Sequence, residues 1–260
     1  NDTRDVPFTR PSILLPQSIY FDRTRNLGMS GDSVQVYGDL SHPKWGSFST
    51  QFGIWWPIVH DRDTHASVLP TGPNGEILMH GNLTREPSYI GRGIYETNDK
   101  RIRLAVSGIW LNTNYMSASN DVVISDGSGS LQFSPIYFSA QYNAERWSLT
   151  SEYAIRHFAF SGFNNSKLDG TNFYGESYYV QGEYRFTPKW EGFVRYDVLF
   201  TDGSDKSGKQ WASSDPKLSG LEHSRYAKDI TVGLRWNVTP EFMLRAEYHH
   251  VIGTGWLSRL

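Results

Sequence analysis

Thr187-Pro188-Lys189-Trp190 is the stretch that decides the fold, because the same kind of turn recurs at Thr239-Pro240-Glu241-Phe242. Looser versions occur at His42-Pro43-Lys44-Trp45 and at Asn143-Ala144-Glu145-Arg146-Trp147. Each turn joins two runs of alternating apolar and polar residues, and long polar segments separate one pair of runs from the next. Short turns that alternate with long loops are typical of an up-and-down antiparallel β-barrel. The sequence therefore predicts an all-β fold of this kind.

Ten strands are expected where apolar and polar residues alternate with a period of two. They pair into hairpins that comprise 33–41 with 46–57, 87–96 with 101–112, 131–142 with 147–158, 176–186 with 190–201, and 228–238 with 242–252. In the last hairpin, Ile230 and Val232 share one face of a strand, while Asp229 and Arg235 share the other. Lengths of about 9–11 residues suit tilted strands that cross a bilayer.

The composition excludes several classes of protein. The 260 residues contain no cysteine, which rules out a disulfide framework and thiolate metal sites. The formal charge is -2 and the isoelectric point is about 6.5, so the chain lacks the basic surface of a nucleic-acid-binding protein. The mean hydropathy of -0.50 argues against membrane helices. A barrel strand is apolar on one face only and is compatible with this low average.

Aromatic residues favour a membrane barrel over a soluble β-sandwich, whose apolar faces would lie between two sheets. Trp45, Trp147, Trp190 and Phe242 each stand directly after a short turn. A ring of aromatic side chains at one end of the strands suits a membrane interface, where such side chains meet headgroups and hydrocarbon together. Candidates for a second ring near the opposite strand ends are Tyr37, Trp55, Trp56, Tyr89, Trp110, Tyr178 and Tyr226.

The N-terminal stretch resembles a segment of Gram-negative outer-membrane porins, which are similar, more distantly, to the phosphate-selective type. It reads Arg4-Asp5-Val6-Pro7-Phe8-Thr9-Arg10-Pro11, followed by Leu15-Pro16-Gln17-Ser18-Ile19-Tyr20-Phe21-Asp22-Arg23-Thr24-Arg25. The resemblance implies that residues 1–30 are a constriction loop folded into the lumen. Residues 31–260 would then form barrel strands with short periplasmic turns and long extracellular loops. It also implies the bacterial outer membrane, contacts with lipid bilayer and lipopolysaccharide, and a homotrimer.

In such porins a strand precedes the constriction loop, so we expect at least one strand ahead of Asn1. The other end agrees, because Trp256-Leu257-Ser258-Arg259-Leu260 follows a predicted strand and enters a loop. An open sheet edge is not stable in lipid. The ten or so strands of this chain are therefore expected to belong to a larger barrel of about 14–18 strands. A barrel of ten or twelve strands completed by these residues is the alternative.

Charged residues on the polar faces of the strands are candidates for the pore wall. Burial of an arginine at the bilayer midplane would cost about 2–4 kcal/mol, so these side chains should face a wet lumen. The set comprises Arg103, Arg156, Arg185, Arg195, Arg235, Arg245, Glu152, Glu183, Glu191, Asp197, Asp229 and Glu247. They could form an electrostatic ladder that guides solutes, or a network of cross-strand ion pairs that stiffens the wall.

Four arginines of the predicted constriction loop are candidates for the narrowest part of the pore. These are Arg4, Arg10, Arg23 and Arg25, and only Asp2, Asp5 and Asp22 oppose them in charge. Guanidinium groups in a narrow passage favour anions, because their planar fork matches carboxylate and phosphate groups. The alternative is a solvated surface loop with local Arg–Asp pairs.

No sequence motif predicts a catalytic centre, a metal site or a cofactor. His249 and His250 are adjacent in a strand, so their rings should point to opposite faces and cannot share one ion. His223, Ser224 and Asp229 could meet His249 as a catalytic set, but nothing fixes their distance.

The sequence thus predicts a passive porin for small hydrophilic solutes, with a mild preference for anions and no enzymatic activity. Two other functions stay open. One is a barrel enzyme, or a barrel that holds a partner protein in the membrane. The other is a soluble all-β module whose exposed aromatic side chains cover hairpin ends and stack on sugar rings.

Overall fold

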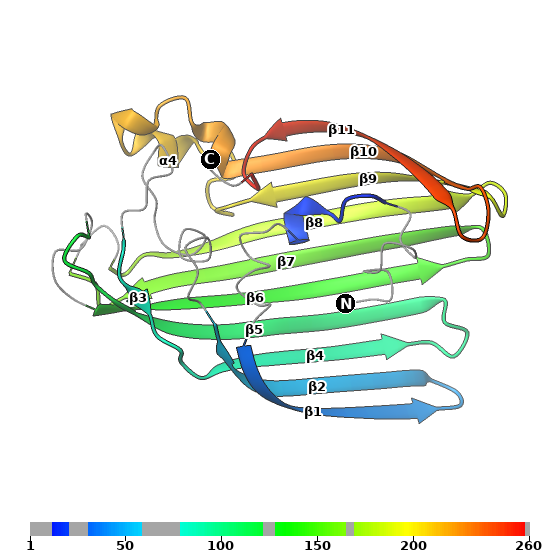
Figure 1. The fold of residues 1–260 in the computed structure, drawn as a ribbon, viewed down its shortest axis with the longest axis horizontal. Helices are drawn as coiled ribbons and strands as arrows, with labels where there is room; N and C mark the ends of the chain where they lie inside the picture. Colours follow the sequence, from blue (N-terminus) through cyan, green and yellow to red (C-terminus); the bar gives the residue numbers. More distant parts are fainter. Residues whose placement is uncertain (1–11, 21–30, 59–78, 122–127, 165–168, 258–260) are drawn as a thin grey trace.

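A computed structural model describes residues 12–20, 31–58, 79–121, 128–164 and 169–257. One antiparallel sheet of eleven strands dominates it, with the order β1-β2-β4-β5-β6-β7-β8-β9-β10-β11, while β3 pairs with β5 (Figure 1). The strands are β1 (Gly31–His42), β2 (Gly46–Pro57), β3 (Asn82–Leu83), β4 (Ser88–Glu96), β5 (Ile102–Met116), β6 (Ser128–Asn143), β7 (Trp147–Ser161), β8 (Asn172–Arg185), β9 (Trp190–Phe200), β10 (Tyr226–Asn237) and β11 (Met243–Gly253). Short helices are α1 (Gln17–Tyr20), α4 (Lys209–Ser213), η3 (Pro216–Leu218) and η4 (Glu222–Arg225).

The predicted all-β, up-and-down antiparallel fold is confirmed, and all ten predicted strands are present. The structure differs at the loop ends. β5 and β7 extend beyond the predicted ends at 112 and 158, and β3 lies in a segment that the pattern assigned to a loop. The added residues include Tyr115 and Phe160, which are buried in an apolar cluster, and Leu83 of β3 pairs with Tyr115. Packing, rather than alternation, sets these strand ends.

The recurring Thr-Pro turn has a direct physical cause. At the β8–β9 turn, the Thr187 hydroxyl accepts hydrogen bonds from the backbone N–H groups of Lys189 and Trp190, at 3.2 and 3.1 Å. At the β10–β11 turn, Thr239 does the same for the two residues that follow its proline, at 3.3 and 3.1 Å. A threonine side chain that caps its own turn in this way reverses the chain within a few residues.

A single glycine fixes the first hairpin. Gly46 follows the β1–β2 turn with a φ of +97°, a conformation that favours glycine. A Cβ atom at this position would lie 2.1 Å from the carbonyl oxygen of Glu96 on the neighbouring strand β4. The turn therefore requires glycine both for its backbone angle and for the close approach of the next hairpin.

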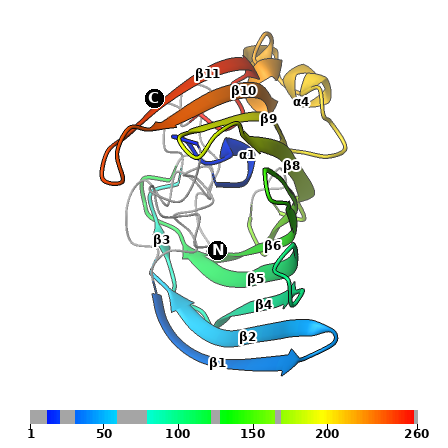
Figure 2. The ribbon, with the colours of Figure 1, turned by 90° about the vertical axis from the view of Figure 1, so that its right-hand side faces the viewer.

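The sheet is strongly curved, and α1 lies on its concave side (Figure 2). Directly opposed residues of antiparallel strands share a face, and one such row on the convex face runs through Leu149, Gly182, Val194, Val232 and Tyr248. Its apolar members are exposed, with 56% for Val194 and 49% for Val232. The convex face is therefore an exposed apolar surface.

The concave face holds the buried side chains. At the loop end it carries an apolar cluster of Trp55, Met79, Leu83, Leu111, Tyr115, Leu131, Phe133, Phe160 and Phe163. Trp55 was expected in a second interface ring, and this expectation is wrong because only 6% of its surface is exposed. Tyr37, another candidate, lies opposite Gln51 in the same alternating set as Trp55 and therefore also faces the concave side. Alternation in this hairpin did not identify which face turns inward.

Among the described residues, β1 and β11 are the two edge strands of the sheet, and no described pairing joins them. Helices α4, η3 and η4 lie in the long connection between β9 and β10. No helix among the described residues is long and apolar enough to cross a membrane.

Candidate functional site

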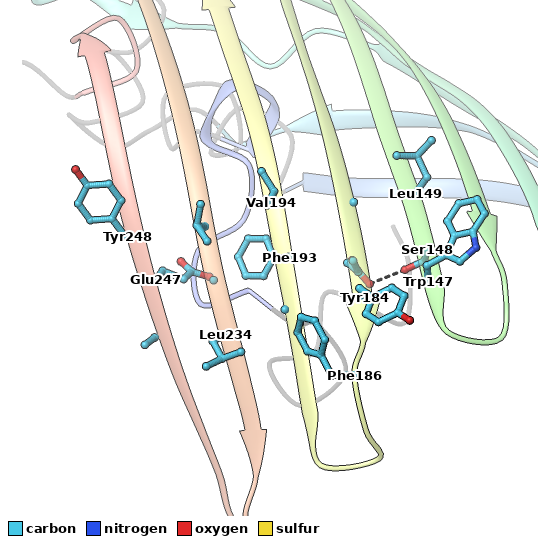
Figure 3. Close-up of a pocket in the computed structure, with 16 residues that line it drawn as sticks. Trp147, Ser148, Leu149, Tyr184, Phe186, Phe193, Val194, Leu234, Glu247 and Tyr248 are labelled. Atoms are coloured by element: carbon cyan, nitrogen blue, oxygen red, sulfur yellow. Dashed lines mark hydrogen bonds between the residues drawn. The ribbon is translucent and has the colours of Figure 1, made fainter.

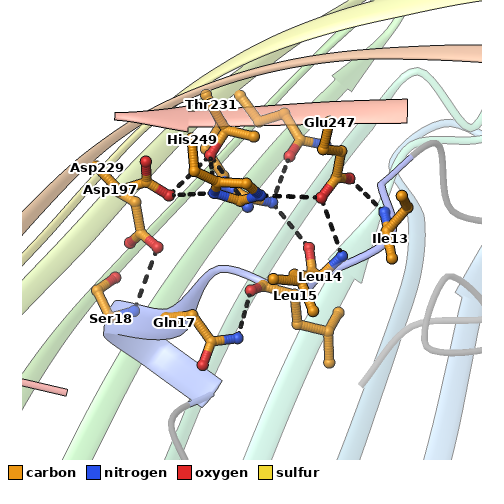
Figure 4. Close-up of polar contacts among 12 residues, drawn as sticks. Ile13, Leu14, Leu15, Gln17, Ser18, Asp197, Asp229, Thr231, Glu247 and His249 are labelled. Atoms are coloured by element: carbon orange, nitrogen blue, oxygen red, sulfur yellow. Dashed lines mark hydrogen bonds and ion pairs between the residues drawn. The ribbon is translucent and has the colours of Figure 1, made fainter. Parts of the chain in front are cut away.

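The candidate site is the concave face of β7 to β11 together with residues 12–20, which we call the strap. The strap includes α1 and crosses the concave face, where α1 packs against β7, β8 and β9 (Figures 2 and 4). Ile19 is buried against Ala154 and Tyr179. The strap lies within the segment that the sequence predicted to be a loop in the lumen, although α1 gives it a helical turn that the pattern did not predict.

The first half of the strap is held through its backbone. The Nη1 group of Arg245 donates to the carbonyl of Ser12 at 2.8 Å. The Glu247 carboxylate accepts hydrogen bonds from the backbone N–H groups of Ile13 and Leu14, the latter at 3.3 Å. Arg195 donates to the carbonyl of Leu14 at 3.1 Å. Charged wall side chains therefore bind both the donors and the acceptors of this backbone segment (Figure 4).

The second half of the strap is held around Ser18. The Nη1 group of Arg156 donates to the Ser18 carbonyl at 2.9 Å, and the Ser18 N–H donates to Oδ2 of Asp197 at 3.3 Å. The Tyr20 hydroxyl donates to Glu152 at 3.1 Å. Arg156 and Asp197 are 2% and 0% exposed, so their contacts with the strap are shielded from water. Hydrogen bonds to charged groups are strongest in such a buried environment.

A histidine joins two of the acidic residues beside the strap. His249 Nδ1 lies 2.8 Å from Asp229 Oδ2, and its Nε2 lies 3.2 Å from Glu247 Oε2. Thr231 donates to the same oxygen of Asp229 at 2.9 Å (Figure 4). The two ring nitrogens of His249 therefore contact carboxylates on opposite sides of the ring. His249 thereby links Asp229 to the carboxylate that binds the strap.

The strand register places all twelve predicted wall residues on the concave face. Some form the predicted ion pairs, since Glu191 lies 4.0 Å from Arg185 and 3.9 Å from Arg235. Glu183 accepts hydrogen bonds from Ser148 and Gln181, at 2.7 and 2.8 Å. Arg103 is half-buried on β5, away from the strap.

Sequence reasoning missed the contacts between the wall and the strap. Arg156, Arg195 and Arg245 bind carbonyl groups of the strap, a role distinct from either a solute ladder or cross-strand pairs. Carbonyl groups occur at every residue, so no side-chain pattern in residues 12–20 could have revealed them. The four arginines predicted for the constriction, Arg4, Arg10, Arg23 and Arg25, lie outside the described residues.

The four predicted interface aromatics stand at the turn ends of their strands. Trp45 is 72% exposed, Phe242 54% and Trp147 45%. Trp190 is stacked on Trp236, with ring centroids 5.0 Å apart and an interplanar angle of 3°. Trp147, Trp190 and Phe242 are among the alternating residues whose side chains face the convex side. Trp45 stacks on His42 within its turn.

The candidate catalytic set is assembled only in part, because Asp229 contacts His249 whereas His223 and Ser224 bind elsewhere. Within the described ranges there is no group of three or more His, Asp or Glu residues that could hold a metal ion. His249 faces the concave side and His250, opposite Ile230, the convex side, as expected for neighbours in a strand. Ser224 donates to the carbonyl of Leu221, and His223 contacts the carbonyl of Gly220, so these two side chains form no nucleophile–base pair.

A solved structure of an outer-membrane channel shares this fold. The outer membrane channel DcaP of Acinetobacter baumannii matches with a TM-score of 0.50 and 13% sequence identity, over 84% of this chain and 55% of that chain. The toluene transporter TbuX of Ralstonia pickettii matches more weakly, with a TM-score of 0.34 and 9% identity over 85% of this chain and 76% of that chain. No protein-family model and no curated protein matches the sequence.

The chain therefore has the fold of an outer-membrane channel barrel. It spans about half the length of the DcaP channel.

Proposed function

We propose that the chain belongs to an outer-membrane porin through which small hydrophilic solutes diffuse passively. One observation carries the proposal: the strap lies on a charged concave face while the convex face of the same strands is exposed and apolar. Charges inside and apolar side chains outside suit a water-filled lumen surrounded by lipid. The strap would narrow the lumen, so that size and charge limit which solutes pass.

A mild preference for anions is the finer part of the proposal. The twelve wall residues carry six arginines and six acidic groups, so the described wall is balanced in charge. The preference therefore depends on the basic excess of residues 1–30, which carry Arg4, Arg10, Arg23 and Arg25. Arginines that line a narrow passage attract carboxylate and phosphate groups, as the resemblance to phosphate-selective porins also suggests.

The assembly of the pore is also part of the proposal. Additional strands would close the sheet into a larger barrel, which is supported by the 55% share of the DcaP chain that this chain covers. An open sheet edge in lipid leaves backbone groups without partners, so closure is expected. We propose an outer-membrane location with lipid and lipopolysaccharide around the convex face, and a homotrimer as in the porins that the sequence resembles.

Planar-bilayer recordings test the proposed function. The wild-type protein should give ohmic conductance, and replacement of Arg4, Arg10, Arg23 and Arg25 by Ala should lower the anion preference measured from the reversal potential in a salt gradient. The matched control replaces four exposed cations away from the strap, Lys44, Lys100, Lys209 and Lys217, by Ala. Equal shifts in both variants would show that net charge, rather than the loop, sets selectivity. Absence of conductance would contradict the porin and favour a plugged scaffold.

A further inference from the structure

A hollow in the convex face lies near the turn ends of β7 to β11 (Figure 3). Its volume is about 720 Å³, within the range of ligand pockets. Two rows of outward residues line it. One row runs Trp147, Tyr184, Gly192, Leu234 and Ala246, and the other runs Leu149, Gly182, Val194, Val232 and Tyr248. We call this hollow the outer groove.

Small residues create the outer groove. Gly192 and Ala246 interrupt one row, and Gly182 interrupts the other. A Cβ atom at Gly182 would meet no atom within 4 Å, so the space above this glycine is open. At Gly192 the Phe186 ring already covers the backbone, and a Cβ there would lie 2.9 Å from its Cε2 atom. A glycine in a strand often marks a place where a ligand approaches the backbone closely.

The walls of the outer groove are apolar and aromatic. Tyr248 is 68% exposed and Phe186 58%, and Phe186 packs edge-on against Tyr184 at 5.2 Å between ring centroids. The convex face meets hydrocarbon under the proposed function. An apolar hollow in that face is the right chemistry for an acyl chain, because filling it restores packing contacts that a gap would lose.

Basic side chains flank the turn end of the outer groove. Arg146 directly precedes Trp147, and Lys189 lies in the turn that follows Phe186. Both residues are exposed, and neither forms an ion pair with another described residue. Glu145 offsets one of the two charges, so the β6–β7 and β8–β9 turns together carry a net charge of +1. This charge complements an anionic phosphate at the level of the headgroups.

We propose that the outer groove binds one anionic glycerophospholipid of the periplasmic leaflet. One acyl chain would occupy the hollow over Gly182, while the phosphate would lie between Arg146 and Lys189. This inference rests on the proposed function, because it requires the convex face to be in a membrane with the short turns on its periplasmic side.

Native mass spectrometry of the protein after delipidation tests the proposal. Phosphatidylglycerol and phosphatidylcholine with identical acyl chains are each added to the wild type, Gly182→Leu and Gly91→Leu. Gly91 is a matched control, because it also lies on the convex face and a Cβ there meets only Phe52, at 4.0 Å. We expect preferential retention of phosphatidylglycerol by the wild type and Gly91→Leu, and loss of that adduct in Gly182→Leu.

The charge is tested separately with the double variant Arg146→Gln and Lys189→Gln. It should bind the two lipids equally, since the groove is intact but the phosphate loses its partners. Equal retention by Gly182→Leu and the wild type would overturn the proposal, as would equal loss in Gly91→Leu. Conversion of an oligomer to monomers by Gly182→Leu would also overturn it, because a second copy would then fill the groove. Wild-type conductance without lipid selectivity would refute this inference alone.

Discussion

The two faces of the same strands differ in a way that reverses the usual arrangement of a soluble protein. On β10, Ile230 and Val232 are 48% and 49% exposed, whereas the alternate residues Asp229 and Thr231 are 2% and 0% exposed. A water-soluble protein buries its apolar side chains and solvates its charges. This difference indicates that the two faces meet different media, and that the strap and the charged wall form a polar interior.

The largest expected effect comes from a charge on the convex face. Phe138→Arg should lower the unfolding free energy in lipid by about 2–4 kcal/mol, because an arginine near the bilayer midplane is desolvated. Phe138 is 48% exposed and points outward from β6. Urea unfolding in liposomes measures this change.

The adjacent substitution Ser139→Arg is the control. Ser139 faces the concave side and donates to Glu152 at 2.9 Å, and an arginine there keeps a donor for that carboxylate. It should be much better tolerated. Equal losses at 138 and 139 would show that the two faces do not meet different media.

A smaller effect is expected inside, where the strap is anchored. Arg156→Met removes a charged hydrogen bond to Ser18, and such bonds contribute about 1.5–3 kcal/mol. Hydrogen exchange of peptides that cover residues 12–20 should become faster, and conductance should rise as the strap loosens. Arg101→Met, at an exposed turn, should change neither. Unchanged exchange in Arg156→Met would show that this arginine does not hold the strap.

Substitution of two neighbouring histidines allows the two faces of one strand to be compared. His249→Gln loses one of the two contacts with Asp229 and Glu247, which should cost about 1 kcal/mol and speed exchange at Ile13 and Leu14. His250→Gln alters only the convex face and should leave the strap unaffected. If both variants exchanged alike, the link from His249 to the strap would be refuted.

The smallest effect concerns the turn ends. Trp190→Leu removes the stacked pair with Trp236 but keeps an apolar side chain, so it should lower the unfolding free energy by only about 0.5 kcal/mol. Thermal unfolding in detergent measures this change. A large loss would indicate that Trp190 belongs to a packed interior and not to an exposed ring.

Most of the fold could be predicted because its determinants are local. Turns such as the one capped by Thr187 recur in the sequence, and alternation assigns residues such as Val232 and Asp229 to opposite faces. The depth of burial on each face was harder to predict. The alternation around Trp55 is the same whether its face of the strand meets lipid or the lumen. Only its contacts with distant strands show that it is buried on the concave face.

The site could be predicted only in part. The wall charges were found because charges on a strand that is apolar on its other face must avoid lipid. The strap contacts could not be predicted, since they join Arg245 and Glu247 to backbone groups more than 230 residues away in the sequence. No pattern in the strap distinguishes a carbonyl that accepts such a bond from one that does not.

Spin labels at two adjacent residues test the central claim most directly. The chain has no cysteine, so single cysteines at Val106 and Ser107 can be labelled without further changes. Val106 lies on the convex face and is 45% exposed, whereas Ser107 lies on the concave face opposite Arg92. In liposomes, the label at 106 should collide mainly with oxygen dissolved in the hydrocarbon, and the label at 107 with a water-soluble nickel chelate. Collision of both labels with the nickel chelate would contradict the account, because water would then reach both faces.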